Sequence, residues 1–220
     1  METDKRKHIH FIISRLIKEY PAPKTTLHYK SPHQLLISTI LSAQCTDERV
    51  NKVTKELFKK YKSVKDYANA ELSELERDIK QTGFFRNKAK NIKNTSKMLI
   101  EKFDGQVPDT MNEILLLPGV ARKTANVVLT SAYGVIEGIV VDTHVKRLSQ
   151  RLGLTKNDNP EKIEKDLMNI VPKDKWAQFS FLLISHGREI CQARKPVCTK
   201  CILNDLCPSR TCAFKVRDEE

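Results

Sequence analysis

Four cysteines near the C-terminal end of the chain have a spacing that suits a metal centre. They follow the pattern C-x6-C-x2-C-x5-C and fall within 17 residues, at Cys191, Cys198, Cys201 and Cys207. Structural zinc sites usually use two C-x2-C pairs that are well separated in sequence, whereas only one such pair is present here. Four thiolates in one compact loop favour a [4Fe–4S] cluster. The segment is too short and polar to bury a core of its own, so we expect the metal centre to order it.

The other cysteines and the loop inside the pattern allow less specific interpretations. We interpret Cys45 as a small core residue, and we assign no role to Cys212 in the polar tail. Four unligated thiols are the alternative to a metal centre, and their register argues against that alternative. Between the first two cysteines of the pattern, Arg194 and Lys195 lie in a loop that can grip a phosphate backbone. Two solvated charges in a basic protein are the alternative for this pair.

A lysine and an aspartate form a second candidate site. Pro118-Gly119 predicts a tight turn between two helices, and Lys123 follows in the first turn of the second helix. The backbone amides at such a helix start attract a phosphate. The positive end of the helix dipole disfavours the charged form of a lysine there, and an uncharged amine can attack carbon and form a Schiff base.

Asp142 can return to the same end of that helix as Lys123. About ten helical residues climb ~15 Å, and the extended run that follows can span up to ~23 Å. The alternative for Asp142 is a simple N-cap of the helix that begins at Thr143, and both roles can coexist. We interpret His144 as a structural hydrogen-bonding residue. An ordinary helical hairpin with a surface lysine is the plain alternative for the whole region.

The elements that must position these residues are predicted to be helices. Polar start signals occur at Ser31-Pro32, Thr46-Asp47 and Asn159-Pro160. Capping-box spacings mark short helices from residues 63, 73 and 110. Apolar periodicity predicts helices near residues 9–17, 32–41, 47–57, 86–103, 110–116, 125–132, 143–153 and 174–187. An extended apolar run covers residues 135–141. We therefore expect an all-α chain with a break between two lobes near Val135.

The composition favours an intracellular protein with an anionic partner. The 220 residues include 39 Lys and Arg against 27 Asp and Glu, which gives a net charge of +12. Nucleic acid is the partner that such a charge favours, although solvated helix faces in a lysine-rich protein are the alternative. No apolar run approaches the length of a membrane span, and the polar N-terminus lacks a signal-peptide core. We expect an intracellular location, where six cysteines indicate metal binding or catalysis rather than disulfides.

Taken together, these motifs resemble the endonuclease III family of bifunctional DNA glycosylases in the helix–hairpin–helix superfamily. The resemblance covers nearly the whole chain. It rests on Leu41-Ser42-Ala43-Gln44, residues 117–128, Val141-Asp142-Thr143-His144, His186-Gly187-Arg188 and the cysteine register. It implies a six-helix barrel lobe over residues 25–135, with the helix–hairpin–helix at residues 108–134. It also implies a [4Fe–4S] lobe from residues 1–24 and 136–220, with DNA across the cleft.

The resemblance also implies an activity and the residues that perform it. Such an enzyme flips an oxidised pyrimidine out of the DNA stack. Lys123 attacks C1′ of the sugar, Asp142 activates it, and β-elimination cuts the strand as an AP lyase. The enzyme is expected to act as a monomer on damaged duplex DNA, in the cytoplasm or at the nucleoid of a prokaryote. The DNA-contact residues carried over are Gln44, which fills the hole left by the base, together with Phe84, Gly119, Val120, Ala121, Arg122, His144, Arg194 and Lys195.

This sequence departs from the family pattern at two positions. Ala121 stands where the hairpin usually has glycine, which is tolerable if that residue is already helical. Gly83-Phe84-Phe85 replaces a Gly-Leu-Tyr run, so Phe84 is a candidate wedge between bases, with a core phenylalanine as the alternative. Other functions left open are a mismatch-specific (G:T or G:U) glycosylase, a non-catalytic DNA-binding protein and a zinc-stabilised structural protein. The first would carry a different residue at the lysine position.

Overall fold

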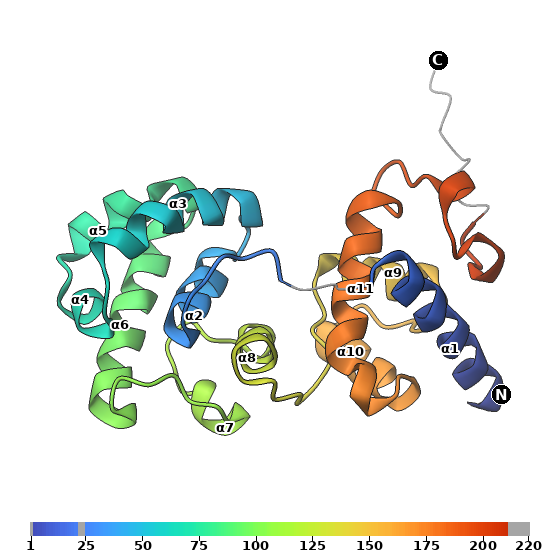
Figure 1. The fold of residues 1–220 in the computed structure, drawn as a ribbon, viewed down its shortest axis with the longest axis horizontal. Helices are drawn as coiled ribbons and strands as arrows, with labels where there is room; N and C mark the ends of the chain where they lie inside the picture. Colours follow the sequence, from blue (N-terminus) through green and yellow to red (C-terminus); the bar gives the residue numbers. More distant parts are fainter. Residues whose placement is uncertain (1, 22–24, 211–220) are drawn as a thin grey trace, which may run out of the picture. The chain divides into compact units, whose positions relative to one another are not determined.

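The chain is helical throughout the part that the structure describes. This computed structural model describes residues 2–21 and 25–210, with side chains from Lys7 onward, and no strand occurs among them. The all-α prediction is confirmed (Figure 1). No helix in the described ranges is long and apolar enough to cross a membrane. Cys212 lies outside the described residues.

The chain divides into two compact units. Unit 1 consists of Met1–Lys24 and Gly138–Glu220, and unit 2 consists of Thr25–Glu137. The extended run of residues 135–141 crosses the boundary without forming a strand, and its last three residues are buried. Lys123 therefore belongs to unit 2, whereas Asp142 and the four patterned cysteines belong to unit 1.

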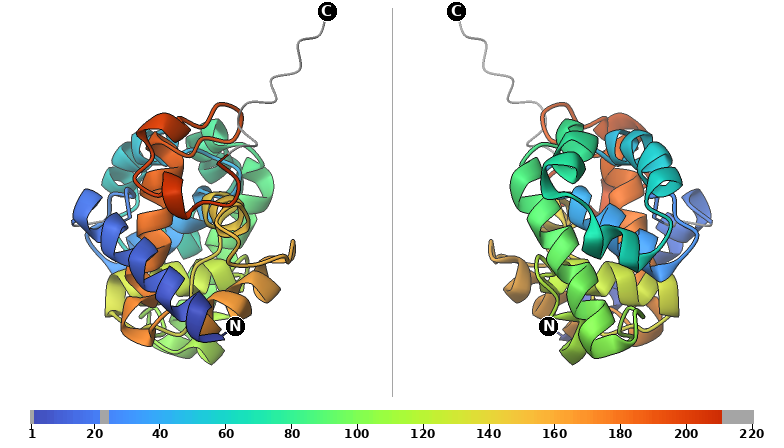
Figure 2. Two further views of the ribbon diagram at one scale, coloured as in Figure 1. Left: turned by 90° about the vertical axis from the view of Figure 1, so that its right-hand side faces the viewer. Right: turned by 90° about the vertical axis from the view of Figure 1, so that its left-hand side faces the viewer.

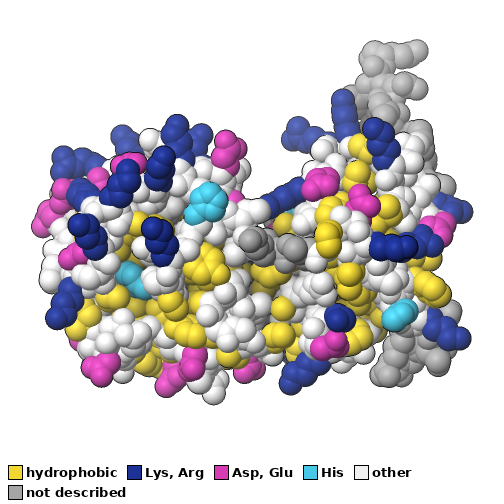
Figure 3. Space-filling model, viewed as in Figure 1, with side chains coloured by type: hydrophobic (Ala, Val, Ile, Leu, Met, Phe, Trp, Pro, Cys, Tyr) yellow, Lys and Arg dark blue, Asp and Glu magenta, His cyan; other side chains and the backbone are white. Residues whose placement is uncertain are grey.

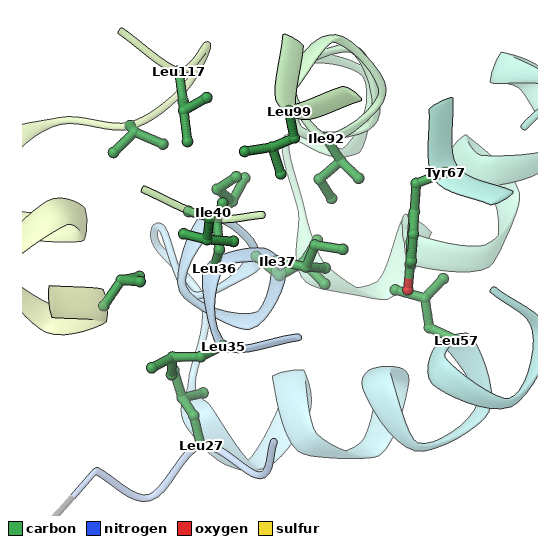
Figure 4. Packing of buried hydrophobic residues seen from close by; sticks show 14 of the residues in the cluster. Leu27, Leu35, Leu36, Ile37, Ile40, Leu57, Tyr67, Ile92, Leu99 and Leu117 are labelled. Atoms are coloured by element: carbon green, nitrogen blue, oxygen red, sulfur yellow. The ribbon is translucent and has the colours of Figure 1, made fainter. Parts of the chain in front are cut away.

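Unit 2 is built around α2 and α6. Every residue of α2 from Leu35 to Leu41 is buried, and α6 packs against α2, α4 and α5. In Figure 4, Ile92 and Leu99 of α6 face Ile37 and Ile40 of α2, which shows how the two helices share one core. The α-helices of this unit are α2 (Pro32–Leu41), α3 (Asp47–Lys60), α4 (Val64–Asn69), α5 (Leu72–Ile79), α6 (Phe85–Phe103), α7 (Met111–Ile114) and α8 (Arg122–Val128), with a 3-10 turn at Lys80–Thr82 and a π turn at Leu129–Tyr133.

Unit 1 packs its N-terminal helix against its C-terminal helices. α1 contacts α10 and α11, and α11 also packs on α9. Figure 2 shows α1 in dark blue beside the orange α11. Arg15 of α1 pairs with Asp205 and donates to the carbonyl oxygen of Ile202 (2.9 Å), which ties α1 to the segment after the cysteines. The helices are α1 (Glu2–Glu19), α9 (Thr143–Arg151), α10 (Pro160–Ile170) and α11 (Trp176–Glu189), with 3-10 turns at Lys173–Lys175, Cys198–Lys200 and Asn204–Leu206.

Helix starts with polar caps lie where the sequence predicts them, and two other helices differ. Ser31, Thr46 and Asn159 each accept a backbone hydrogen bond as N-caps. The helix predicted from Ser73 instead begins at Leu72, with Glu71 at the N-cap and no side-chain cap bond within the described chain. The helix expected over 110–116 shortens to α7, because a proline disfavours helical backbone at the residue before it and Pro118 follows closely.

Basic side chains are spread among acidic ones on the surface. Figure 3 shows Lys and Arg side chains gathered over α3 and α5 of unit 2, with Asp and Glu between them. Some of these charges pair, as Lys60 does with Glu74 (2.8 Å) and Asp78 (2.6 Å). The positive surplus therefore does not by itself locate a binding face, and the individual residues must do so.

Candidate functional site

The turn before α8 is shaped by its contact with α6. Gly119 has φ +77°, a left-handed conformation that disfavours any side chain. A Cβ at this position would lie 2.6 Å from Nδ2 of Asn91, which belongs to α6. Thr95 of α6 also donates a hydrogen bond to the carbonyl oxygen of Pro118 (2.7 Å). The glycine is thus required by close packing inside unit 2, and α6 fixes the position of the turn.

The residues after this turn present different groups to solvent. Val120 is buried, and its amide donates to the carbonyl oxygen of Leu117 (3.1 Å). Neither its side chain nor its amide is therefore available to a DNA phosphate. Ala121 is exposed with φ −90° and ψ 167°. The sequence predicts that alanine is tolerated at this position if the residue is helical, but Ala121 is not helical. Alanine is accommodated because any residue adopts this extended backbone.

Lys123 is the second residue of α8 and is exposed. Its neighbour Arg122, the first helical residue, is half-buried. No side chain caps this helix start within the described residues, since Ala121 at the N-cap carries no acceptor. Over the same ranges, Lys123 has neither an ion pair nor a side-chain hydrogen bond. The amine is therefore accessible to a ligand.

Asp142 begins α9, as predicted. Its Oδ1 accepts a hydrogen bond from the backbone amide of Val145 (2.8 Å), and the residue is half-buried. The structure therefore shows the N-cap role that the sequence left as the alternative for Asp142, and this role fixes the carboxylate at the positive end of the helix. The second carboxylate oxygen is not used by the cap.

His144 follows in the first turn of α9 and is held by Arg147. Burial lowers the pKa of His144, and the nearby Asp142 opposes that shift while Arg147 and Arg188 add to it. Nη2 of Arg147 donates to Nδ1 of His144 (3.1 Å) and to the carbonyl oxygens of Gly187 and Cys191 (both 2.9 Å). A neutral, hydrogen-bonded imidazole agrees with the structural role expected from the sequence.

Arg147 is a residue that sequence reasoning missed. It links the start of α9 to the end of α11 and to the first patterned cysteine, over 40 or more positions along the chain. Gly187 permits this contact, because a Cβ there would lie 2.9 Å from Nδ1 of His144 and 3.1 Å from Nη2 of Arg147. The run His186-Gly187-Arg188, which contains this glycine, is the available signal.

The four patterned cysteines come together around one cavity of about 450 Å³. Arg151, Arg194 and Lys195 also line this cavity. Burial raises the pKa of Cys201 to about 11 and also raises the pKa of Cys207. Among the described residues, no three His, Cys, Asp or Glu side chains are arranged to hold a single metal ion. The thiols instead surround a larger space. Cys45 packs beside the core of unit 2, as predicted.

Three groups hydrogen-bond the cysteine sulfurs. Nη1 of Arg151 donates to Sγ of Cys191 (3.3 Å), and the amide of Leu203 donates to Sγ of Cys201 (3.4 Å). Nε2 of the buried His186 lies 3.2 Å from Sγ of Cys201, while its Nδ1 lies 3.2 Å from the hydroxyl of Tyr20. The sequence offers no direct signal for Arg151 or Tyr20, because Arg151 reaches Cys191 across 40 positions and Tyr20 reaches His186 across 166.

Arg194 and Lys195 lie in the exposed loop between the first two cysteines. Within the part of the chain that the structure describes, neither side chain takes part in an ion pair or hydrogen bond. Their charges are therefore available to a partner.

Gln44 and Phe84 share an unusual backbone conformation. They have φ values of 53° and 46°, in the left-handed region that residues other than glycine rarely adopt. Gln44 is exposed, and the Phe84 residue is 65% exposed. The alternative of a core phenylalanine is therefore wrong at Phe84. The neighbouring Phe85 is the one that packs against the core.

Comparison with known proteins places this arrangement in a family. Residues 37–173 match the HhH-GPD superfamily of base excision DNA repair proteins. The chain is 57% identical to endonuclease III of Synechocystis sp. over 198 residues, which cover 90% of each protein. A structure of a trapped covalent intermediate between endonuclease III and DNA superimposes with a TM-score of 0.90 at 44% identity, covering 94% of this chain and 97% of that one.

A second solved structure provides a contrast within the superfamily. A thermostable thymine-DNA glycosylase superimposes with a TM-score of 0.83 at 28% identity, covering 95% of this chain and 98% of that one. The fold is thus shared by both kinds of protein, while the sequence is closer to endonuclease III. The chain belongs to the endonuclease III family of the HhH-GPD superfamily of base excision DNA repair proteins.

Proposed function

We propose that the chain removes oxidised pyrimidines from duplex DNA and then cuts the strand as an AP lyase, through a Schiff base on Lys123. The observation that carries this proposal is the state of Lys123: an exposed amine without an ion pair in the described chain, in the first turn of α8. The trapped covalent complex of the related endonuclease III supports it. The enzyme acts as a monomer on DNA in a prokaryotic cell.

The reaction assigns a separate role to each of two side chains. The uncharged amine of Lys123 attacks C1′, the N-glycosidic bond breaks, and the base leaves with a proton. The C1′–O4′ bond then breaks, O4′ takes up a proton, and the protonated Schiff base that forms acidifies C2′. Loss of a C2′ proton breaks the C3′–O bond and expels the 3′ phosphate. The carboxylate of Asp142 takes the proton that the lysine nitrogen releases once it is bonded to C1′, and it stabilises positive charge at C1′. Its N-cap bond holds it in place for both tasks.

DNA contacts are assigned to exposed groups of both units. Gln44 fills the space of the flipped base and Phe84 stacks between neighbouring bases. The exposed backbone of Gly119 and Ala121, followed by Arg122, meets a phosphate at the start of α8. Arg194 and Lys195 grip the backbone, and His144 contributes as a neutral hydrogen-bonding group.

A [4Fe–4S] cluster is assigned to Cys191, Cys198, Cys201 and Cys207. Four sulfur ligands around one cavity, with Arg151 and His186 next to the sulfurs, suit such a group. The compact spacing with a single C-x2-C pair supports a cluster over a zinc site, which usually uses two such pairs well separated in sequence. When bound, the cluster orders the segment that presents Arg194 and Lys195.

Strand cleavage of a duplex oligonucleotide with one thymine glycol tests the proposed function. The wild-type enzyme is expected to cut 3′ to the lesion, Lys123→Ala to lose cutting, and Asp142→Asn to bind DNA but act more slowly by about 10² or more. Lys195→Ala serves as the lysine control and should retain chemistry at saturating enzyme. Base release by Lys123→Ala at the wild-type rate would favour the mismatch-type glycosylase instead, a candidate that the sequence relationships already make weaker.

A further inference from the structure

Lys88 is a charged residue inside the core of unit 2. Only 4% of its surface is exposed, in the first part of α6. Burial of a lysine is costly unless its ammonium finds acceptors. Nζ of Lys88 donates to the carbonyl oxygens of Leu41 and Thr82, both at 2.8 Å.

These two carbonyl groups end the elements that precede Gln44 and Phe84. Leu41 is the last residue of α2, three positions before Gln44, and Thr82 is the last residue of the 3-10 turn, two positions before Phe84. Carbonyl groups at helix ends lack partners within the helix and attract a cation. One ammonium therefore satisfies both ends and fixes their separation.

The two loops that follow Leu41 and Thr82 also contain residues with strained backbone. Gln44 and Phe84 both have left-handed backbone, and with Asp104 they are the non-glycine residues with positive φ in the described chain. Such a conformation persists only where the surrounding structure enforces it. Both side chains are exposed, so their own packing does not supply that restraint.

We propose that Lys88 is a positioning residue, which holds the Gln44 and Phe84 loops at the separation needed for both side chains to enter a duplex together. The proposal rests on the proposed function, since it assumes that these two residues enter DNA. Lys88 itself touches no DNA and acts through the backbone of the two loops. Methionine at this position keeps the length of the side chain and removes the two hydrogen bonds.

A double-mutant cycle tests the proposal. Single-turnover excision of thymine glycol is measured for Lys88→Met, Gln44→Ala/Phe84→Ala and their combination. We expect Lys88→Met to slow excision at least about tenfold, because misplacement of about 1 Å can cost about 10² in rate. In the Gln44→Ala/Phe84→Ala background, Lys88→Met should have almost no further effect. An undiminished further effect would mean a general structural role and would overturn the proposal.

Lys93 offers a matched control on the same helix. Its Nζ donates to the carbonyl oxygen of Ala70 (2.6 Å), in a loop that carries no assigned DNA contact. Lys93→Met should excise at the wild-type rate, and an equal loss in both variants would contradict the proposal. If Lys88→Met does not fold by circular dichroism, Lys88→Gln replaces it in the same cycle, because its side chain is one bond shorter and cannot reach both carbonyl oxygens.

A fluorescent reporter opposite the lesion separates positioning from stability. With 2-aminopurine as the orphaned base, wild-type binding should change the fluorescence, and Lys88→Met should reduce that change at saturating protein. If wild type is active but Gln44→Ala/Phe84→Ala is equally fast, the assigned DNA roles fail and this inference fails with them. If that double variant is slow and Lys88→Met is not, the inference alone fails.

Discussion

Gly119 illustrates how one residue can serve the fold and the site at once. The sequence predicts a tight turn at Gly119 and the family resemblance implies a DNA contact there, and the structure adds an internal reason for its presence. Its left-handed φ and its contact with Asn91 both exclude a side chain. The position of the turn, and of Lys123 after it, depends on this packing against α6.

Replacing Gly119 with alanine should therefore destabilise the protein more than a comparable change elsewhere. Gly105 has nearly the same φ (+74°), but a methyl group added there would have no neighbouring atom within 4 Å, so Gly105→Ala measures the backbone cost alone, about 1–2 kcal/mol. Gly119→Ala adds the clash with Asn91, and Asn91→Ala in that background should recover part of the added loss, because it removes Cγ and Nδ2 but keeps Cβ, which lies 2.8 Å from the added methyl group. Urea unfolding measures all of these variants. Equal losses at the two glycines would contradict the packing argument.

His33 predicts a dependence of stability on pH. Its Nε2 is buried without a hydrogen-bond partner in the described structure, and its ring meets that of Tyr67 at 5.3 Å. Burial lowers the pKa of His33 to about 4, from an ordinary value of 6.5. The unfolded chain therefore takes up a proton first, and stability present above pH 6.5 is lost as the pH falls toward 4.

His33→Phe should remove that loss. The wild type is expected to lose up to about 3 kcal/mol from this residue between pH 7 and pH 4, at 1.36 kcal/mol for each unit of difference between the folded and unfolded pKa. The comparison is the difference in unfolding free energy between the two proteins at pH 7 and at pH 4.5. A constant difference would show that His33 does not titrate as its burial requires.

The elements show what local sequence can and cannot predict. The predicted starts of helices with polar N-caps are confirmed. Each cap side chain accepts a hydrogen bond from a backbone amide only two or three residues later in the sequence, as at Ser31, Thr46, Asp142 and Asn159. α5 lacks such a cap, and its predicted start is wrong. The cysteine register predicts the ligands by type and spacing alone.

Contacts between distant elements leave no local signal. Lys88 lies in a helix rich in lysine, and nothing in its neighbours marks it as the buried one. Its acceptor in Leu41 is 47 positions away. Arg147 likewise reaches Cys191 across 44 positions. Such pairs are set by how the helices pack, so only the structure reveals them.

The loop between Cys191 and Cys198 gives a prediction at the element scale. Arg194 and Lys195 are exposed and unpaired over the described residues, so each can displace a counterion from DNA. Arg194→Ala with Lys195→Ala should make the slope of log binding constant against log salt less steep by about two. Fluorescence anisotropy at several salt concentrations measures the slope. An unchanged slope would return both residues to the role of solvated charges.

At the scale of the whole molecule, the assigned chemistry draws on both units. Lys123, Gln44 and Phe84 belong to unit 2, while Asp142, His144 and the cysteines belong to unit 1. Each unit has its own buried hydrophobic core. The effect of a substitution on the packing of one unit can therefore be measured separately from the packing of the other.

Cys201→Ser tests the assigned cluster at this scale. Wild-type protein purified without air should contain iron and absorb near about 400 nm, as an iron–sulfur protein does. Cys201→Ser should lose most of both signals and weaken DNA binding, because the loop carrying Arg194 and Lys195 is no longer ordered. Stoichiometric zinc in the wild type, with no such absorbance, would contradict the assignment.

The central claim is that Lys123 forms a covalent bond to the sugar, and borohydride trapping tests it most directly. Enzyme is mixed with a duplex containing thymine glycol or an abasic site, and borohydride reduces any Schiff base to a stable link. Wild type and Lys195→Ala are expected to give a protein–DNA adduct that Lys123→Ala does not. Peptide mapping should then find the DNA on Lys123. No adduct from active, cluster-loaded wild-type enzyme, or an equal adduct from Lys123→Ala, would contradict the account.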